Sequence, residues 1–248
     1  MANRYYVDRP IRFAAGEPPR VTLAGSEAHH LIHVMRAAEG ARVVLFDGSG
    51  AEFPSRVERV GRADLELTVL QRHEVNRELP RHVALGVSLP KGERQRWLVE
   101  KAVELGVAEL IPLATLRSVA QPVQQALDRL RRAVIEASKQ CGRNRLMQIA
   151  EPMDWPDFIE ATRREPQRLL AHPGCGPSGR ESRAKTGPPH GFPPPADRVL
   201  AAIGPEGGLA PEEAAVAKAA GWRPVGLGPR ILRTETAALV MAALAGSG

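Results

Sequence analysis

The strongest constraint on the fold is a change of pattern near Pro80. Before this residue the chain consists of short segments in which apolar and polar residues partly alternate, separated by Gly and Pro. After it, apolar segments alternate with amphipathic ones. Period-two alternation is typical of half-buried strands, and strands that alternate with helices are typical of a parallel α/β sheet. The sequence therefore predicts an α/β protein whose first part is a small β-barrel or sandwich.

In the first part, strands are expected at 4–7, 11–13, 20–23, 42–47, 52–60 and 64–70. One helix is expected over 26–37, because Ser26 can cap its start and Gly40 can end it. The polar segment 71–81 resembles a linker, so we expect two domains, over residues 1–74 and 80–248.

In the second part, strands are expected at 82–89, 107–113, 168–171, 198–203 and 224–228, and helices at 91–106, 122–141, 211–220 and 235–244. The helix 122–141 has an apolar stripe on one side and basic residues on another, so it can pack on one side and meet a polyanion on the other. The segment of about 173–197 is rich in Gly and Pro and is expected to be a flexible surface loop.

The positive charge is concentrated in one segment. The formal net charge is +6, and residues 81–145 carry 12 basic and 6 acidic residues, whereas the blocks on either side are balanced. Such a zone fits a polyanion, because neutralising phosphates provides affinity that is independent of sequence. It fits a solvated, arginine-rich helix surface equally well.

Several classes of protein are disfavoured. No apolar run approaches the roughly 18 residues that span a bilayer, and the N-terminus lacks a secretory signal, so a cytoplasmic location is expected. Two cysteines, Cys141 and Cys175, are too few for a disulfide framework or a zinc site. In "HHLIH" the position of the catalytic Glu of a metalloprotease helix is taken by His30, so no metal is expected. The serine-hydrolase elbow, the P-loop lysine and the dinucleotide fingerprint are also missing.

Two glycine-rich segments each follow an apolar segment and precede a helix: "IGPEGGLAPEE" at 203–213 and "LGPRILRTETA" at 227–237. Taken alone, the first is more typical of a tight structural turn than of a ligand site. Together, two such strand exits predict the walls of a pocket at the carboxyl edge of a parallel sheet. Thr234 is the candidate N-cap of the helix that follows the second segment. Backbone groups with few charges suit an adenosine moiety better than a triphosphate.

At these residues the sequence resembles the RsmE family, bacterial enzymes of the SPOUT class that methylate N3 of a uridine in small-subunit (16S) ribosomal RNA. The resemblance covers nearly the whole chain. It rests on the two glycine-rich segments and on "HLIHVMR" at 30–36, "LFDGSG" at 45–50, "KGERQRWLVEKAVELGVAELIPL" at 91–113 and "EASKQCGRNR" at 136–145. The chain departs from the family at Met147, where proline is common, and in its longer insert before Asp197.

The resemblance implies a PUA-like β-barrel that helps bind RNA, followed by a SPOUT-type α/β domain with a C-terminal trefoil knot. It also implies a homodimer with S-adenosyl-L-methionine as the cofactor. The implied cofactor-binding residues are Leu170, His172, Ile203, Gly204, Pro205, Glu206, Gly207, Leu227, Gly228, Ile231, Leu232, Arg233 and Thr236.

Methylation of uridine N3 requires loss of its proton and stabilisation of the resulting anion. Arg233, or as second choice Arg230, suits the stabilising role, and Glu206 or Glu235 suits that of the base. Alternatively, Glu206 hydrogen-bonds backbone and has a structural role. The residues expected to hold the RNA are Arg36, Arg94, Arg132, Arg143 and Arg145. Two other functions stay open: a SPOUT enzyme acting on another site, such as a transfer RNA ribose, and a catalytically silent RNA-binding assembly factor.

Overall fold

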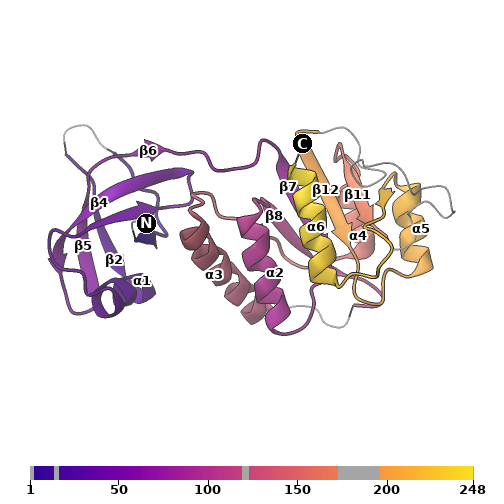
Figure 1. Ribbon diagram of the computed structural model, residues 1–248, viewed down its shortest axis with the longest axis horizontal. Coiled ribbons are helices and arrows are strands. Elements are labelled where there is room, and N and C mark those ends of the chain that lie inside the picture. Colours follow the sequence, from indigo (N-terminus) through magenta and orange to yellow (C-terminus); the bar gives the residue numbers. More distant parts are fainter. Residues whose placement is uncertain (1–2, 14–16, 119–122, 173–195, 248) are drawn as a thin grey trace. The chain divides into compact units, whose positions relative to one another are not determined.

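The computed structural model of the chain describes residues 3–13, 17–118, 123–172 and 196–247. Its contacts divide the chain into two compact units (Figure 1): a first unit of Met1–Glu78 with Ser138–Leu146, and a second unit of Leu79–Ala137 with Met147–Gly248. Cys175 and residues 173–195 of the expected flexible loop lie outside the described residues. In the part of the chain that the structure describes, no helix combines the length and apolar character needed to cross a membrane.

The first unit is built on a six-stranded sheet in the order β1-β3-β4-β5-β2, with β6 beside β4. The strands are β1 (Arg4–Tyr6), β2 (Arg20–Ala24), β3 (Arg42–Phe46), β4 (Ala51–Val60), β5 (Asp64–Val69) and β6 (His73–Glu74). β1 runs parallel to β3, and the other pairs are antiparallel. In β5, Leu65, Leu67 and Val69 are buried and alternate with partly exposed residues, which is the pattern that predicted the strand.

Three details of the first unit differ from the prediction. Residues 11–13 are not a strand. The expected helix over 26–37 is shorter: α1 (Gly25–His29) continues into a π-helical turn at His30–Val34. Ala24, not Ser26, is the N-cap residue, and no side chain caps the helix. Arg36 adopts a left-handed conformation with φ of 51°, so the chain leaves the helix before Gly40.

The second unit contains a parallel sheet in the order β10-β8-β7-β12-β11-β13, with β9 beside β8. Its strands are β7 (His82–Val87), β8 (Glu109–Ala114), β9 (Gln148–Ile149), β10 (Met153–Asp154), β11 (Arg168–Ala171), β12 (Arg198–Ile203) and β13 (Arg223–Val225). The central strands β7 and β12 are buried at every position but the first. Burial on both faces explains their continuous apolar sequences and confirms the predicted parallel sheet.

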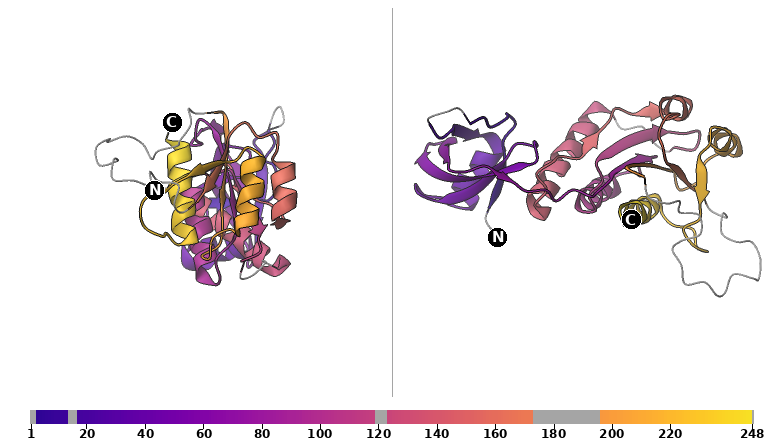
Figure 2. Two further views of the ribbon diagram at one scale, coloured as in Figure 1. Left: turned by 90° about the vertical axis from the view of Figure 1, so that its right-hand side faces the viewer. Right: turned by 90° about the horizontal axis from the view of Figure 1, so that it is seen from above.

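Helices cover both faces of this sheet. They are α2 (Glu93–Glu104), α3 (Gln124–Cys141), α4 (Trp155–Ala161), α5 (Pro211–Ala219) and α6 (Thr234–Gly246). In the left view of Figure 2, α6 and α2 lie on one side of the strands and α4 and α5 on the other. Trp155, Phe158 and Trp222 form an aromatic cluster between α4, α5 and the sheet. A Cβ on Gly86 of β7 would lie 2.6 Å from the Phe158 ring, so the close packing of α4 requires glycine there.

Candidate functional site

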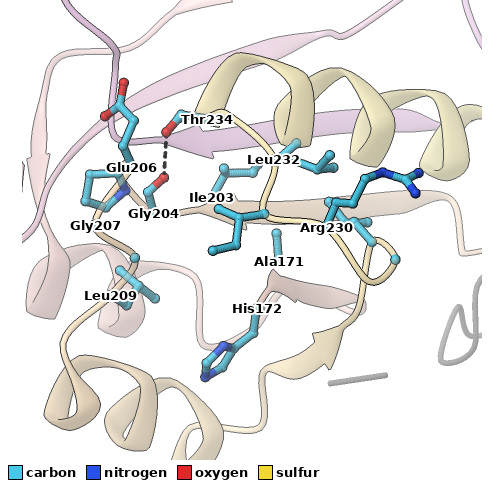
Figure 3. Close-up of a pocket in the computed structure, with 16 residues that line it drawn as sticks. Ala171, His172, Ile203, Gly204, Glu206, Gly207, Leu209, Arg230, Leu232 and Thr234 are labelled. Atoms are coloured by element: carbon cyan, nitrogen blue, oxygen red, sulfur yellow. Dashed lines mark hydrogen bonds between the residues drawn. The ribbon is translucent and has the colours of Figure 1, made fainter. Parts of the chain in front are cut away.

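A cavity lies at the carboxyl ends of three adjacent strands of the second unit. β11 runs between β12 and β13, and its last residue, Ala171, pairs with Ile203 on one side and Val225 on the other. The chain leaves all three strands at one edge of the sheet, which is where α/β proteins bind ligands. The residues lining the cavity (Figure 3) are Ala171, His172, Ile203, Gly204, Pro205, Glu206, Gly207, Gly208, Leu209, Leu227, Gly228, Arg230, Ile231, Leu232, Thr234 and Ala237.

The first wall of the cavity is the turn after β12. The amide of Gly208 donates a hydrogen bond to the Pro205 carbonyl oxygen over 2.8 Å, and Gly208 has φ of 69°, a value that favours glycine. A Cβ on Gly204 would lie 3.1 Å from the Leu209 side chain, so a larger residue would push the turn away from the strand. The glycines therefore allow a tight turn whose backbone faces the cavity.

A buried carboxylate, Glu213, holds this turn in place. Its Oε2 accepts a hydrogen bond from the amide of Ala210 and its Oε1 one from the amide of Leu116, each over 2.8 Å. Its carbonyl oxygen accepts a third from the indole of Trp155. Sequence reasoning missed this residue. The available signal was Pro211 at the first helical position with a glutamate two residues later, an arrangement typical of a helix start.

The second wall is the segment 227–234, which leads into α6. Its last residue, Thr234, was expected to be the N-cap, but the N-cap is Arg233 and no side chain caps this helix. The Thr234 hydroxyl instead donates a hydrogen bond to the carbonyl oxygen of Gly204 over 3.2 Å, shown as the dashed line in Figure 3. This bond joins the two walls of the cavity.

Most of the residues implied as cofactor contacts line this cavity: His172, Ile203, Gly204, Pro205, Glu206, Gly207, Leu227, Gly228, Ile231 and Leu232. Leu170 is fully buried within the sheet, one residue before the rim. Thr236 is exposed on α6, and Arg233 faces a neighbouring hollow. Four further lining residues that were not anticipated, Ala171, Gly208, Leu209 and Ala237, are small or apolar.

The neighbouring hollow shares Pro205 and Glu206 with the cavity. Its other lining residues are Leu89, Pro90, Lys91, Arg94 and Arg233. Arg94 Nη1 lies 3.1 Å from Glu206 Oε1 and 3.6 Å from Glu235 Oε1. In Figure 3 the Glu206 carboxylate points away from the space between His172 and Ile203. The two candidate arginines are thus separated, because Arg233 lines the hollow and Arg230 lines the cavity.

The other expected RNA contacts are in different surroundings. Arg132 lines a groove between α2 and α3 and donates a hydrogen bond to the Asp128 carbonyl oxygen. Arg36 and Arg145 are exposed in the first unit. Arg143 is 4% exposed, and its Nε donates a hydrogen bond to Glu78 over 3.1 Å. Its guanidinium therefore ties the segment 138–146 to the first unit.

The structure also shows the surroundings of the histidines and Cys141. The rings of His29 and His33 are tilted against each other by 52°, with centroids 4.7 Å apart. Within the described residues, no group of three or more His, Cys, Asp and Glu side chains could hold a metal ion. Cys141 is a partly buried free thiol at the end of α3.

Comparison with known proteins agrees with this geometry. Residues 77–246 match the RNA methyltransferase domain family, and residues 23–70 match the RNA methyltransferase PUA domain. The ribosomal RNA small subunit methyltransferase E of Bacillus subtilis is 30% identical over 96% of this chain and 93% of its own length.

Two solved structures share the fold along almost the entire chain. A putative methyltransferase of Legionella pneumophila with bound S-adenosylmethionine has a TM-score of 0.85 and 29% identity over 99% of this chain and 97% of its own. The ribosomal RNA small subunit methyltransferase E of Neisseria gonorrhoeae, also bound to S-adenosylmethionine, has a TM-score of 0.80 and 27% identity over 98% and 96%. The fold is thus that of an α/β methyltransferase with an N-terminal PUA-like domain, and the chain belongs to the family of ribosomal RNA small subunit methyltransferase E.

Proposed function

We propose that this protein is an enzyme that uses S-adenosylmethionine to methylate N3 of a specific uridine in the 16S ribosomal RNA of the small ribosomal subunit. Relatives over nearly the full length are ribosomal RNA small subunit methyltransferases, and the two similar structures contain this cofactor. The observation that carries the proposal is the cavity formed by two glycine-rich walls at the carboxyl ends of β11, β12 and β13.

The residues present fit this cofactor. Apolar side chains such as Ile203, Leu209 and Leu232 offer contacts to a nucleoside, and the backbone of the two walls offers hydrogen-bond donors and acceptors. When bound, S-adenosylmethionine supplies an electrophilic methyl group on its sulfonium sulfur. The protein's own residues hold the acceptor nitrogen in line with the methyl group and the sulfur, and they exclude other geometries. This positioning accounts for much of the acceleration in such transfers.

The acceptor nitrogen must also lose its proton. We assign anion stabilisation to Arg233, because it lines the hollow beside the cofactor cavity, whereas Arg230 lines the cofactor cavity itself. Glu206 is the proposed proton acceptor, since its carboxylate is at the boundary of cavity and hollow and is oriented by Arg94. Glu235 is buried behind Arg94 and serves to position it.

The family resemblance supports finer features of the domains and of their assembly. Residues 1–74 form the PUA-like RNA-binding domain and residues 80–248 the SPOUT methyltransferase domain, whose C-terminal segment forms a trefoil knot. The protein acts as a homodimer, with each cofactor pocket near the interface. An enzyme that modifies ribosomal RNA acts where ribosomes assemble, so we propose a cytoplasmic location.

The RNA backbone is held by four arginines: Arg36, Arg94, Arg132 and Arg145. Arg143 supports the segment that presents Arg145.

The test is mass spectrometry of 16S ribosomal RNA from cells with and without this protein. We expect one N3-methyluridine to disappear on deletion and to return with the wild-type gene. Complementation with R233A should fail, whereas R230A should restore the modification at least in part. An unchanged content of methyluridine on deletion would refute the proposed function.

A further inference from the structure

The hollow beside the cofactor cavity combines an apolar floor with a cationic rim. The floor is formed by three buried residues, Leu89, Pro90 and Pro205. The positive charge of the rim comes from Lys91, Arg94 and Arg233. Leu89–Lys91 belong to the connection between β7 and α2, so strand, helix and glycine-rich turn all contribute to this hollow. It adjoins the cofactor cavity at Pro205 and Glu206, which line both.

The charges in the hollow are unbalanced in favour of an anion. Among the described residues, Lys91 and Arg233 have no ion-pair partner, whereas Arg94 is shared between Glu206 and Glu235. Glu235 is 5% exposed, and its Oε2 has no hydrogen-bond partner among the described residues. The hollow thus has three positive charges, on Lys91, Arg94 and Arg233, against the negative charges of Glu206 and Glu235. Of the two carboxylates, only Glu206 lines the hollow.

We propose that this hollow is the binding site of the acceptor nucleotide, with its base on the apolar floor and its phosphate held by Lys91 and Arg94. The assignment rests on the proposed function and adds the place at which the RNA is bound for reaction. An unpaired uridine offers a flat base, whose face can pack on the apolar floor, and a phosphate whose negative charge matches the excess positive charge. The shared residues Pro205 and Glu206 place the base next to the cofactor cavity, where N3 can reach the methyl group.

Arg94 has a second role as a positioning residue. Its guanidinium lies between the carboxylates of Glu206 and Glu235, so it orients Glu206 at the wall between the two sites. Lys91 has no such contact and acts on the phosphate alone. The two side chains should therefore have separable effects on binding and on turnover.

The test uses the full-length protein, in vitro transcribed 16S ribosomal RNA and methyl-labelled S-adenosylmethionine. The variants are K91A and R94A. The matched control is R163A, which removes the same charge after α4, where Arg163 is exposed and pairs with Glu160. Equilibrium binding of the RNA is measured over a series of salt concentrations, and KM for RNA and kcat are measured at saturating cofactor.

We expect K91A to raise KM for RNA about tenfold and to reduce the slope of log affinity against log salt by about one, with kcat and cofactor affinity unchanged. R94A should show the same loss of slope and also a lower kcat, because Glu206 is no longer oriented. R163A should match the wild type. If K91A behaves like R163A, the hollow is not the acceptor site, even though the wild type is active. If the wild type itself transfers no label to the RNA, the proposed function fails instead.

Discussion

The hydroxyl of Thr234 donates a hydrogen bond to the carbonyl oxygen of Gly204 over 3.2 Å, although the two residues are 30 positions apart in the chain. Thr234 is 2% exposed and begins α6, and Gly204 begins the turn after β12. Both line the cofactor cavity. A single side chain thus sets the distance between the two walls that enclose the ligand.

The first prediction is that Thr234→Val weakens cofactor binding. The substitution keeps the side-chain shape but removes one hydrogen bond, which costs about 1 kcal/mol, or about fivefold in Kd. Thr234→Ser, which keeps the hydroxyl, and Thr236→Val on the exposed side of the same helix should bind S-adenosylmethionine like the wild type. Titration calorimetry measures all three, and equal affinities for T234V and wild type would show that the bond does not define the cavity.

The same residue shows where local sequence rules end. Threonine before "ETAA" is typical of a helix cap, but a tertiary partner, the Gly204 carbonyl, receives its hydroxyl. Sequence reasoning has no means to weigh a partner 30 residues away. Strands are easier to predict, because the apolar residues of a buried strand form a continuous run in the sequence. Strands β11 and β12 accordingly begin and end at the predicted residues, 168–171 and 198–203.

The helix α4 was not predicted for a related reason. It has only seven residues, too few for a helical period to show, and Pro156 falls at its second position. Proline is acceptable there because the first amides of a helix have no partner within it. The cavity could be predicted because the glycine-rich segments mark both of its walls. The hydrogen bond from the Leu116 amide to Glu213 has no local sequence signal, because the two residues are 97 positions apart.

The second prediction is that Glu213→Ala destabilises the second unit and weakens cofactor binding. The buried carboxylate accepts hydrogen bonds from the amides of Ala210 and Leu116, and its loss leaves both donors without that acceptor. We expect a loss of about 3 kcal/mol in the free energy of unfolding. All three tryptophans of the chain lie in the second unit, so tryptophan fluorescence in urea follows its unfolding.

Glu212 provides the matched control, since it is the preceding glutamate of the same helix and is exposed. Glu212→Ala should change neither the urea midpoint nor the Kd for S-adenosylmethionine. Equal stability of the two variants would contradict the anchoring role of Glu213.

The third prediction is that Gly86→Ala destabilises the second unit by overpacking. A Cβ at this position of β7 would lie 2.6 Å from the ring of Phe158 and 3.0 Å from Leu113. Forcing an extra methyl group into such a core costs about 2 kcal/mol. Shortening the opposing ring in the double variant Gly86→Ala/Phe158→Leu should recover part of this loss relative to the sum of the two single variants. Additive losses in urea unfolding would show that the two sites do not touch.

The fourth prediction concerns the pH dependence of the first unit through Glu52, whose Oε2 lies 2.9 Å from Arg4 and 3.0 Å from Arg77. Burial raises its pKa, but the hydrogen bonds and charges of the two arginines outweigh this, and the pKa falls below 4.5. The folded state therefore gains stability above pH 4.5 and loses it as the pH falls through the lowered pKa. Glu52→Gln should cost about 2 kcal/mol at pH 7, and this cost should shrink as the pH is lowered below 4.5. Near-ultraviolet circular dichroism of Tyr5 and Tyr6 follows the unfolding; a cost that stayed constant with pH would rule out the ion pair as its source.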